Sequence, residues 1–380
     1  MESARPASLI DVIHERGRLT VAAFMDLALY DPRFGYYARA AQRTGRAGDF
    51  FTSVDVGPLF GELLETQIAE MAALMGSPDA PFDLIEIGAG NGRLAADILR
   101  GTVRRHPELA AHTRLHLIEV SPAARAAQAA TLGDLAPRLE TSTDTMPAGL
   151  RGVLVANELL DAMPVHQVVR RGNTLREVFV VRDGERLSTE EGSLSTPAIA
   201  EYLDAIGVAL EDGWRIEVNL RAPAWIADVA RRLERGFAIL IDYGHPAQEL
   251  YSASHAGGTL TTFSRHTMAG ADTPGMPAWL VRPGEQDITS HVDFTTVQAA
   301  ARAAGFDVLG FLDQTYFLMG LLEDTDLTVG LSPAQQMKRR LALKTLLMPG
   351  GLGSTCKVLI LGKDMGTPAL KGCSYRVRVT

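Results

Sequence analysis

A glycine-rich segment that follows a short apolar run constrains the fold of this chain most. It reads LIEIGAGNGR and covers residues 84–93. The apolar residues predict a buried strand, and the glycines after Glu86 allow a sharp turn and a close approach of a ligand to the backbone. A helix that begins after such a turn points its free amide groups at that ligand. The segment therefore predicts an α/β fold with a ligand at the carboxyl end of this strand.

The spacing of the glycines distinguishes between ligands. Gly88, Gly90 and Gly92 follow the pattern G-x-G-x-G, whereas nicotinamide and flavin sites normally show G-x-G-x-x-G. The observed pattern, with Glu86 two positions earlier, resembles the first motif of class I methyltransferases. A glycine turn without any ligand is the alternative for the motif taken alone.

A second acidic residue supports the methyltransferase interpretation. Glu119 ends the next apolar run, LHLIEV, where a carboxylate can accept hydrogen bonds from both ribose hydroxyls of a nucleoside; a solvated carboxylate is the alternative. S-adenosylmethionine carries a sulfonium cation, which suits an acidic site better than an anionic pyrophosphate does. We therefore expect S-adenosyl-L-methionine as cofactor and S-adenosyl-L-homocysteine as product, bound by residues that include Glu86, Gly88, Gly90 and Glu119.

The rest of the chain alternates short apolar runs with helical stretches, which predicts a mostly parallel sheet. Residues 166–187, HQVVRRGNTLREVFVVRDGERL, break this alternation and predict antiparallel strands with turns at Gly172-Asn173 and Asp183-Gly184. The expected core strands are 83–87, 115–120, 152–156, 237–242, 307–312 and 357–361, and the clearest helices are 93–105, 122–132 and 295–304.

These patterns divide the chain into three parts. We expect residues 1–75 to form an N-terminal helical segment that packs on the core. Residues 76–165 and 235–380 form the Rossmann-like core, whose loop 255–292 is long enough to act as a cap. Residues 166–234 form an inserted hairpin and helix region for the substrate.

Polar residues follow the expected strand 152–156 at the ligand-bearing edge of the sheet. Asn157, Glu158 and Asp161 offer an amide and two carboxylates, which can orient an amine or a guanidinium and accept its proton. Alternatively, Asn157 caps a helix and Asp161 makes a surface hydrogen bond. We favour a functional role for Glu158 and for Asn157, which we also count among the cofactor contacts, and leave both interpretations of Asp161 open.

Another polar stretch precedes a helical pattern near the N-terminus. It contains Gly48, Asp49, Thr52 and Ser53, which we count as further cofactor-binding candidates. Asp49 can pair with the ammonium group of the methionine moiety. Thr52 and Ser53 can cap the following helix, and capping alone is the alternative interpretation.

Composition excludes several other classes. A net charge of −8 argues against nucleic acid as the main partner. No run of about 18 apolar residues indicates a membrane span. Cys356 and Cys373 cannot form a disulfide framework, which favours a reducing compartment, and with no recognisable leader we expect a cytoplasmic protein. No repeated His, Cys or Asp spacing predicts a metal site.

Segments along nearly the whole chain resemble one family, the MidA-like methyltransferases, which include the mitochondrial complex I assembly factors that methylate a protein arginine. NELLDA and DITSHVDFT are the most specific of these segments. The matching segments are 19–37, 48–64, 84–99, 156–165, 239–251, 257–266, 283–295, 314–322 and 346–363.

The resemblance implies an α/β class I methyltransferase fold, with a Rossmann-like core of seven mostly parallel strands, N-terminal helices and α+β cap insertions. It also implies a protein arginine N-methyltransferase. It adds His291 to the catalytic candidates Glu158, Asn157 and Asp161, although a structural pair with Asp293 is equally open for this histidine. Asp242, Tyr243 and Gly244 are implied to lie near the catalytic mouth.

One departure from the family leaves the methyl acceptor open. Residues 267–282, TMAGADTPGMPAWLVR, are longer and more apolar than expected there. The alternatives are therefore a small-molecule O-, N- or C-methyltransferase on the same fold or a non-catalytic assembly factor, which the intact glycine and acidic motifs disfavour. The expected partners are an arginine-bearing protein or a small-molecule acceptor, with a homodimer also considered.

Overall fold

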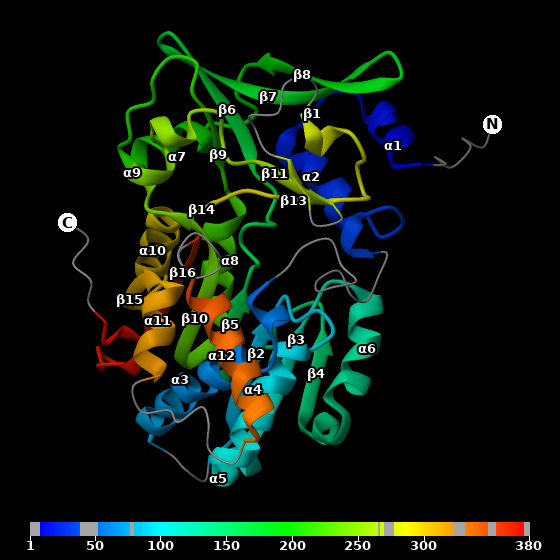
Figure 1. The fold of residues 1–380 in the computed structure, drawn as a ribbon. Coiled ribbons are helices and arrows are strands. Elements are labelled where there is room, and N and C mark those ends of the chain that lie inside the picture. The colour runs from blue at the N-terminus through cyan, green and yellow to red at the C-terminus, as the bar shows by residue number, and fades with distance from the viewer. Residues whose placement is uncertain are drawn as a thin grey trace.

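The protein consists of a large α/β core and a smaller β-rich cap that lies over one end of the core sheet (Figure 1). A computed structural model describes residues 8–38, 52–76, 80–264, 267–269, 277–322, 331–348 and 355–375. The strand order of the core sheet is β15-β16-β10-β5-β2-β3-β4, and β14 pairs with the end of β10.

The core sheet is mostly parallel, as the sequence predicts. Its parallel strands are β10 (Leu233–His245), β5 (Leu150–Asn157), β2 (Phe82–Ile87), β3 (Thr113–Ile118) and β4 (Leu139–Thr143). Two antiparallel strands, β16 (Cys356–Lys363) and β15 (Asp307–Asp313), continue the sheet. The expected class I core of seven mostly parallel strands is confirmed along this path, with the short β14 (Val292–Asp293) added.

Helices cover both faces of the core sheet. Because successive side chains of a strand point to opposite faces, Val153 and Val155 pack with one helical layer, and Leu154 with the other. The first layer contains α3 (Leu59–Met75), α4 (Arg93–Arg105), α11 (Gln314–Leu322) and α12 (Pro333–Leu347). The second contains α8 (Arg221–Arg232) and α10 (Phe294–Ala303). The remaining core helices are α5 (Pro107–His112) and α6 (Pro122–Leu132).

The cap is built on an antiparallel sheet of order β1-β7-β6-β9, with β8 beside β7. Its hairpins turn at Gly172 and Gly184, as predicted, and both glycines have positive φ. A small second sheet, β12-β11-β13, lies beside it. The strands are β1 (Leu19–Thr20), β6 (His166–Arg171), β7 (Thr174–Asp183), β8 (Arg186–Gly192), β9 (Arg215–Val218), β11 (Thr261–Ser264), β12 (Thr267–Ala269) and β13 (Asp287–Thr289). The helices are α1 (Leu9–Arg16), α2 (Val21–Tyr30), α7 (Ala198–Ile206) and α9 (Ala247–Leu250).

The N-terminal helices belong to the cap, which differs from the expected packing of residues 1–75 on the core. Leu19 pairs with Val180 of β7, and the apolar face of α2 is therefore buried against the cap sheet. Of this segment only α3 packs on the core. Conversely, α8 lies within the expected insertion 166–234 but covers the core sheet.

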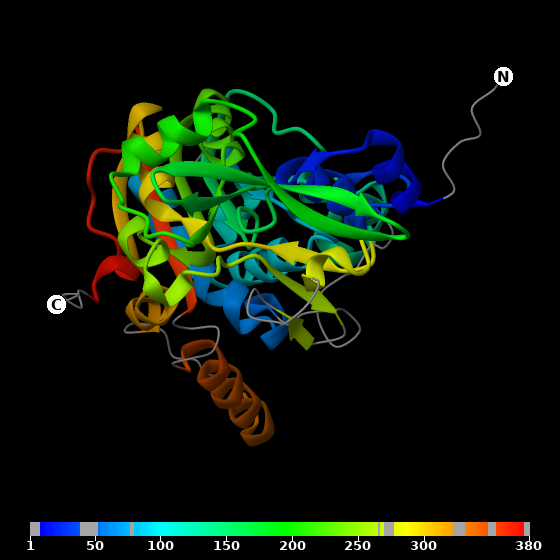
Figure 2. The same cartoon turned by 90° about the horizontal axis from the view of Figure 1, so that it is seen from above.

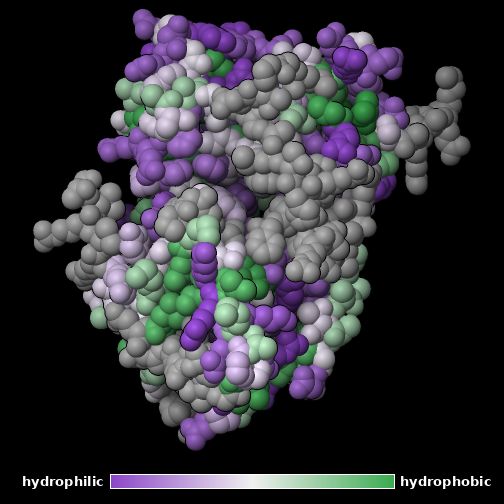
Figure 3. Space-filling model, in the orientation of Figure 1, coloured by the Kyte–Doolittle hydropathy of each residue, from purple (hydrophilic) through white to green (hydrophobic). Residues whose placement is uncertain are grey.

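One helix that the sequence did not predict is partly exposed on the outer surface. Figure 2 shows α12 projecting from one side of the molecule, and Met337 and Leu341 on it are more than half exposed. In the space-filling view, hydrophobic side chains reach the surface in the lower half, where α12 lies (Figure 3). Within the described ranges, no helix combines the length and apolar content that a membrane span needs.

Candidate active site

A cavity of about 690 Å³ lies between the carboxyl ends of β2, β3 and β4 and the cap. Its volume falls in the range of about 300–1,000 Å³ that is common for small-molecule sites. The lining comes from the glycine loop, the ends of β3 and β4, the loop after β5, and helices α2 and α8. These lining residues include Tyr30, Tyr37, Gly88, Glu119, Val120, Asp144, Thr145, Leu159, Met163, Arg221 and Trp225.

The glycine loop forms one wall of this cavity with its backbone. Gly88, Gly90 and Gly92 have φ values of 74°, 52° and 83°, a region that favours glycine. The amides of Gly88 and Ala89 donate to the carbonyl of Ile118, at 2.9 and 3.1 Å, which fixes the loop against β3. A Cβ at Gly88 would lie 3.1 Å from Leu159 Cδ1, so a side chain there would narrow the site.

Glu119 stands at the predicted position, at the end of β3 and on the wall of the cavity. One carboxylate oxygen accepts from Gly90 N at 2.8 Å and the other from Ser121 N at 2.7 Å. Each oxygen keeps a further lone pair, so the carboxylate can still accept from hydroxyl groups of a ligand. The expected ribose contact stays a prediction.

Glu86 is used differently from Glu119. It is not among the residues that line the cavity, and its carboxylate accepts from Ala95 N at 3.0 Å, in the first turn of α4. Burial raises the pKa of Glu86 to about 8. Its direct role is to hold the start of α4 behind the glycine loop, and a contact with the cofactor stays a prediction.

The loop after β5 is organised by one buried carboxylate, Asp242 at the end of β10. Its Oδ2 atom accepts from the amides of Leu159, Leu160 and Asp161, at 3.0, 2.7 and 3.4 Å. Its other oxygen accepts from Tyr243 N at 2.9 Å. The adjacent strand thus fixes the backbone that carries the predicted catalytic residues.

Glu158 sits in this loop with a strained backbone. Its φ of 51° is uncommon for a residue with a side chain, and its amide donates to Ile241 O at 2.8 Å. Strain of this kind persists where the surroundings fix it, often at functional sites. Beside Glu158, Asn157 donates its side-chain amide to the glutamate carboxylate at 3.4 Å, while its own Oδ1 is buried without a hydrogen-bond partner.

Three carboxyl groups of this region have raised pKa values. Burial, followed by Asp242 and then Asp55, raises the pKa of Glu158 to about 8. Burial raises the pKa of Asp242 to about 7, against the opposing effect of the loop amides. Burial and the neighbouring carboxylates raise the pKa of Asp161 well above its usual value. Within the described part of the chain, no Lys or Arg forms an ion pair with these three groups.

The predicted cofactor residues Thr52 and Ser53 lie on the other side of Glu158, and the backbone of Ser53 lowers the pKa of that glutamate against the larger effect of burial. Thr52 donates from its amide and its hydroxyl to Asp55 at 3.0 and 3.1 Å, as a cap of a short helical turn. Ser53 is buried and donates to Gln314 Oε1 at 3.2 Å. Neither residue lines the cavity. The predicted contacts of Gly48 and Asp49 lie outside the described residues.

His291 and Asp293 lie at the junction of core and cap and do not line the cavity. Asp293 caps α10, accepting from Thr295 N at 2.9 Å, and also accepts from the Tyr202 hydroxyl at 2.8 Å. His291 lies between His245 and His255 instead of beside Asp293. Burial and these two rings lower the pKa of His291 to about 4. A catalytic role for His291 stays a prediction.

Several lining residues were not predicted from the sequence. Asp144 and Thr145 follow β4, whose polar sequence LETST gives little strand signal. Had β4 been predicted, these two residues would have been expected in the site, because ligands of open α/β sheets bind beyond the carboxyl ends of the strands. Tyr30 and Trp225 come from α2 and α8, whose packing only the tertiary structure reveals.

The cavity suits S-adenosylmethionine. Glu119 and the glycine backbone line it and can receive a nucleoside, whereas Asn157, Glu158 and Asp161 are not among its lining residues. The acidic surroundings suit a cation. Together with the sheet order, these features define a class I methyltransferase.

The comparison with known proteins then identifies the family. The chain belongs to the family described as "Putative S-adenosyl-L-methionine-dependent methyltransferase", whose model matches residues 63–312. It is therefore an enzyme that uses S-adenosyl-L-methionine as methyl donor, and the resemblance to MidA-like methyltransferases is confirmed.

Individual relatives agree with this assignment. "Protein arginine methyltransferase NDUFAF7 homolog, mitochondrial" from Drosophila melanogaster is 30% identical over 379 residues, covering 91% of this chain and 82% of the relative. The human protein arginine methyltransferase NDUFAF7 is 29% identical over 85% of this chain and 74% of its own length. A Burkholderia thailandensis crystal structure with bound S-adenosyl-homocysteine superposes with a TM-score of 0.85, at 29% identity, covering 98% of this chain and 95% of that chain.

The expected cytoplasmic location is contradicted by these relatives. The Drosophila, mouse and human proteins are all named as mitochondrial. The expectation depended on the lack of a recognisable leader, and the lack of a signal is weak evidence for any compartment.

The glycine loop provides a first test of the cavity. We expect Gly88→Val to weaken binding of S-adenosylmethionine at least 100-fold in calorimetric titration, because the side chain enters the cavity wall. Gly207→Val is the matched control: its φ is also positive, at 66°, but a Cβ there meets nothing within 4 Å. Both variants carry a backbone cost of about 1–2 kcal/mol. Equal affinity in the two variants would contradict the assignment of the cavity.

Asp242 provides a second test. In Asp242→Asn an NH₂ group must face either the loop amides or Tyr243 N, so at least one buried donor loses its acceptor. We expect the free energy of unfolding to fall by about 1–3 kcal/mol, measured by urea denaturation. Asp307→Asn, at an exposed position, should change it by less than about 0.5 kcal/mol. The same small change in both variants would show that Asp242 does not hold the loop.

Proposed function

We propose that this methyltransferase transfers its methyl group to a guanidinium nitrogen of an arginine in a protein partner. The observation that carries the proposal is a group of three carboxyls, the buried Asp161 and Asp242 and the half-buried Glu158, with no cationic side chain paired to them in the described ranges. Buried carboxylates are costly unless a positive charge compensates them. A guanidinium is the side-chain cation that pairs best with carboxylates. The relatives named above as protein arginine methyltransferases support the same acceptor.

Glu158 and Asp161 are the residues that we assign to the acceptor. They leave the sheet together after β5, and the Asp242 carboxylate fixes the backbone between them. Two carboxylates can hold a planar guanidinium in one orientation through parallel hydrogen bonds. Orientation of this kind lowers the barrier because the attacking nitrogen is held in line with the reacting carbon.

The chain must also remove one proton. When bound, S-adenosylmethionine supplies an electrophilic methyl group on a sulfonium. The acceptor nitrogen forms the new N–C bond as the S–C bond breaks, and the nitrogen loses a proton. Glu158 accepts that proton, since the cationic acceptor favours the ionised form of its carboxyl. Asn157 Oδ1, which is buried without a partner, accepts a hydrogen bond from the cofactor or the acceptor.

Substitution of the proposed base gives a direct test. We expect Glu158→Gln to reduce methyl transfer at least 100-fold, because the amide keeps the shape but cannot take a proton. The dissociation constant for S-adenosylmethionine should change less than about threefold. Glu234→Gln, at an exposed glutamate of β10 that pairs with Arg151, should retain full activity.

The assay also identifies the acceptor class. Each variant is incubated with methyl-labelled cofactor and a cell extract, and the protein fraction is hydrolysed to amino acids. Label in methylarginine that depends on Glu158 supports the proposal. Label only in small metabolites would replace it with a small-molecule methyltransferase, and full activity of Glu158→Gln would remove this residue from the mechanism.

The raised pKa of Glu158 predicts the dependence of the reaction on pH. The base works only when deprotonated, so kcat/KM should rise about tenfold per pH unit below its pKa and level off above about 8. The measurement follows initial rates from pH 6 to 9.5, with cofactor affinity determined at each pH as the control. A flat profile over this range would exclude Glu158 as the base.

A further inference from the structure

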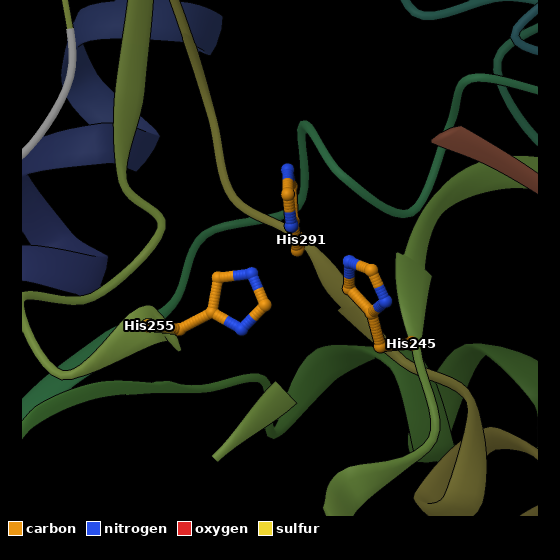
Figure 4. Close-up of side chains that lie close together, drawn as sticks. All are labelled: His245, His255 and His291. Atoms are coloured by element: carbon orange, nitrogen blue, oxygen red, sulfur yellow. The ribbon is translucent and has the colours of Figure 1, made fainter. Parts of the chain in front are cut away.

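We propose that His245, His255 and His291 form a binding site for a single Zn²⁺ ion at the junction of core and cap. One ring nitrogen from each histidine lies within 4.8 Å of the other two. Figure 4 shows the three rings facing a shared space, and their centroids are 5.1, 5.3 and 5.8 Å apart. The site does not depend on the proposed acceptor.

Three different segments bring these histidines together. His245 is the last residue of β10, and His255 ends the short helical turn Ala253–His255. His291 directly precedes β14, whose Val292 pairs with Gly244 and whose Asp293 pairs with His245. The parallel pairing of β10 and β14 therefore fixes two of the rings next to each other, while the third comes from the segment that connects α9 to the cap sheet.

The free nitrogen of each ring is set by its other contacts. His255 Nδ1 lies 3.1 Å from the backbone oxygen of Glu249, and His245 Nδ1 lies 2.8 Å from the Glu249 carboxylate. The second contact is close but outside hydrogen-bond angles, so a small ring rotation completes it. In His245 and His255, Nε2 is thus left for a metal. Metal-bound histidines typically use the second nitrogen in this way, toward a carboxylate or a carbonyl.

In His291 the nitrogen available to a metal is Nδ1, whereas in His245 and His255 it is Nε2. The Nδ1 atom of His291 is buried and has no hydrogen-bond partner, which is costly for a polar atom unless a ligand satisfies it. The chain fixes the position of this ring through the backbone, because His291 N donates to Thr259 Oγ1 at 3.0 Å. In the cluster, the buried Nδ1 atoms of both His245 and His291 thus lack a hydrogen-bond partner, and only His245 has a carboxylate, that of Glu249, beside this atom.

The ligand set selects the metal. Neutral imidazoles suit Zn²⁺ and neighbouring transition metals, whereas Mg²⁺ and Ca²⁺ prefer oxygen ligands. Zn–N bonds of about 2.0–2.1 Å in a tetrahedron bring the nitrogens to about 3.4 Å from one another. The nitrogens lie within 4.8 Å of one another, so the rings must turn toward the ion to reach this geometry. A fourth position stays open for water, as in other three-histidine zinc sites.

The ion would link the cap to the loop of the candidate active site. Ser290 N donates to Asp161 O at 2.9 Å, so the segment that carries His291 is bonded directly to the loop after β5. His255 belongs to the segment that leads into the cap sheet. Zn²⁺ on all three histidines would therefore hold core, cap and loop in one arrangement, and should raise the unfolding temperature.

Metal binding to the untagged full chain tests the proposal. After removal of metals with a chelator and dialysis, ZnCl₂ is titrated calorimetrically and Co²⁺ is added separately as a spectroscopic probe. We expect one Zn²⁺ per chain with a micromolar or lower dissociation constant, a higher unfolding temperature, and the visible absorption of four-coordinate Co²⁺. His255→Gln and His291→Gln should each weaken Zn²⁺ binding at least tenfold and abolish the Co²⁺ spectrum.

His112→Gln serves as the matched control, since His112 lies on α5 at the opposite end of the core (Figure 1). This variant should bind both metals as the unsubstituted chain does. Metal-free unfolding temperatures establish that each variant is folded. The proposal would be overturned if the unsubstituted chain bound no stoichiometric Zn²⁺, or if both cluster variants bound Zn²⁺ as tightly as the unsubstituted chain does.

Discussion

The carboxylate of Asp242 is the contact on which the candidate active site depends. It receives hydrogen bonds from three successive amides of the loop after β5 and from Tyr243 N. Without it, those amides would be buried donors with no acceptor. The strand that carries Asp242 lies in the middle of the core sheet, between β5 and β16. The loop after β5 is therefore held in place by the core sheet. The strained backbone of Glu158 can persist because the loop is fixed in this way.

The electrostatic cost of this arrangement indicates what the site binds. Burial is the main cause of the raised pKa values of Glu158, Asp161 and Asp242, and the neighbouring carboxylates add to it for Glu158 and Asp161. Between the ordinary carboxyl pKa and the raised one, the native state binds more protons than the unfolded chain. Stability therefore decreases as pH rises from the ordinary values of 3.8 and 4.5 to about 7 for Asp242 and about 8 for Glu158, and levels off above them. A sulfonium or guanidinium cation offsets this cost. These carboxyls thus make the unliganded protein less stable than it would be with apolar side chains at the same positions. A cationic ligand that binds the native state raises the stability again.

Local signals in the sequence predict the core, and tertiary packing determines the rest. The strand, glycine loop and helix over residues 82–105 follow from a continuous apolar run, three glycines and a clear periodicity. β4 was not predicted because it is a polar edge strand. Asp144 and Thr145, which follow it, were therefore missed as well. The placement of α2 on the cap depends on the pairing of β1 with β7, which no local pattern contains. The three histidines are separated by 10 and 36 positions in the sequence. The pairing of β10 with β14 brings His245 and His291 together, and the turn Ala253–His255 adds His255.

Core and cap meet at the loop after β5, and this placement links cofactor, acceptor and cap. From the cap, the Tyr30 hydroxyl donates to Ala162 O at 2.9 Å, and Ser290 N donates to Asp161 O. From the core, Asp242 holds the amides of the same loop. A displacement of the cap would therefore pull on the residues beside Glu158. It would also reach the cavity, because Tyr30 and Tyr37 of the cap line it together with Gly88 and Glu119 of the core. The position of the cap is thus linked both to the cofactor cavity and to the loop that carries the proposed acceptor residues.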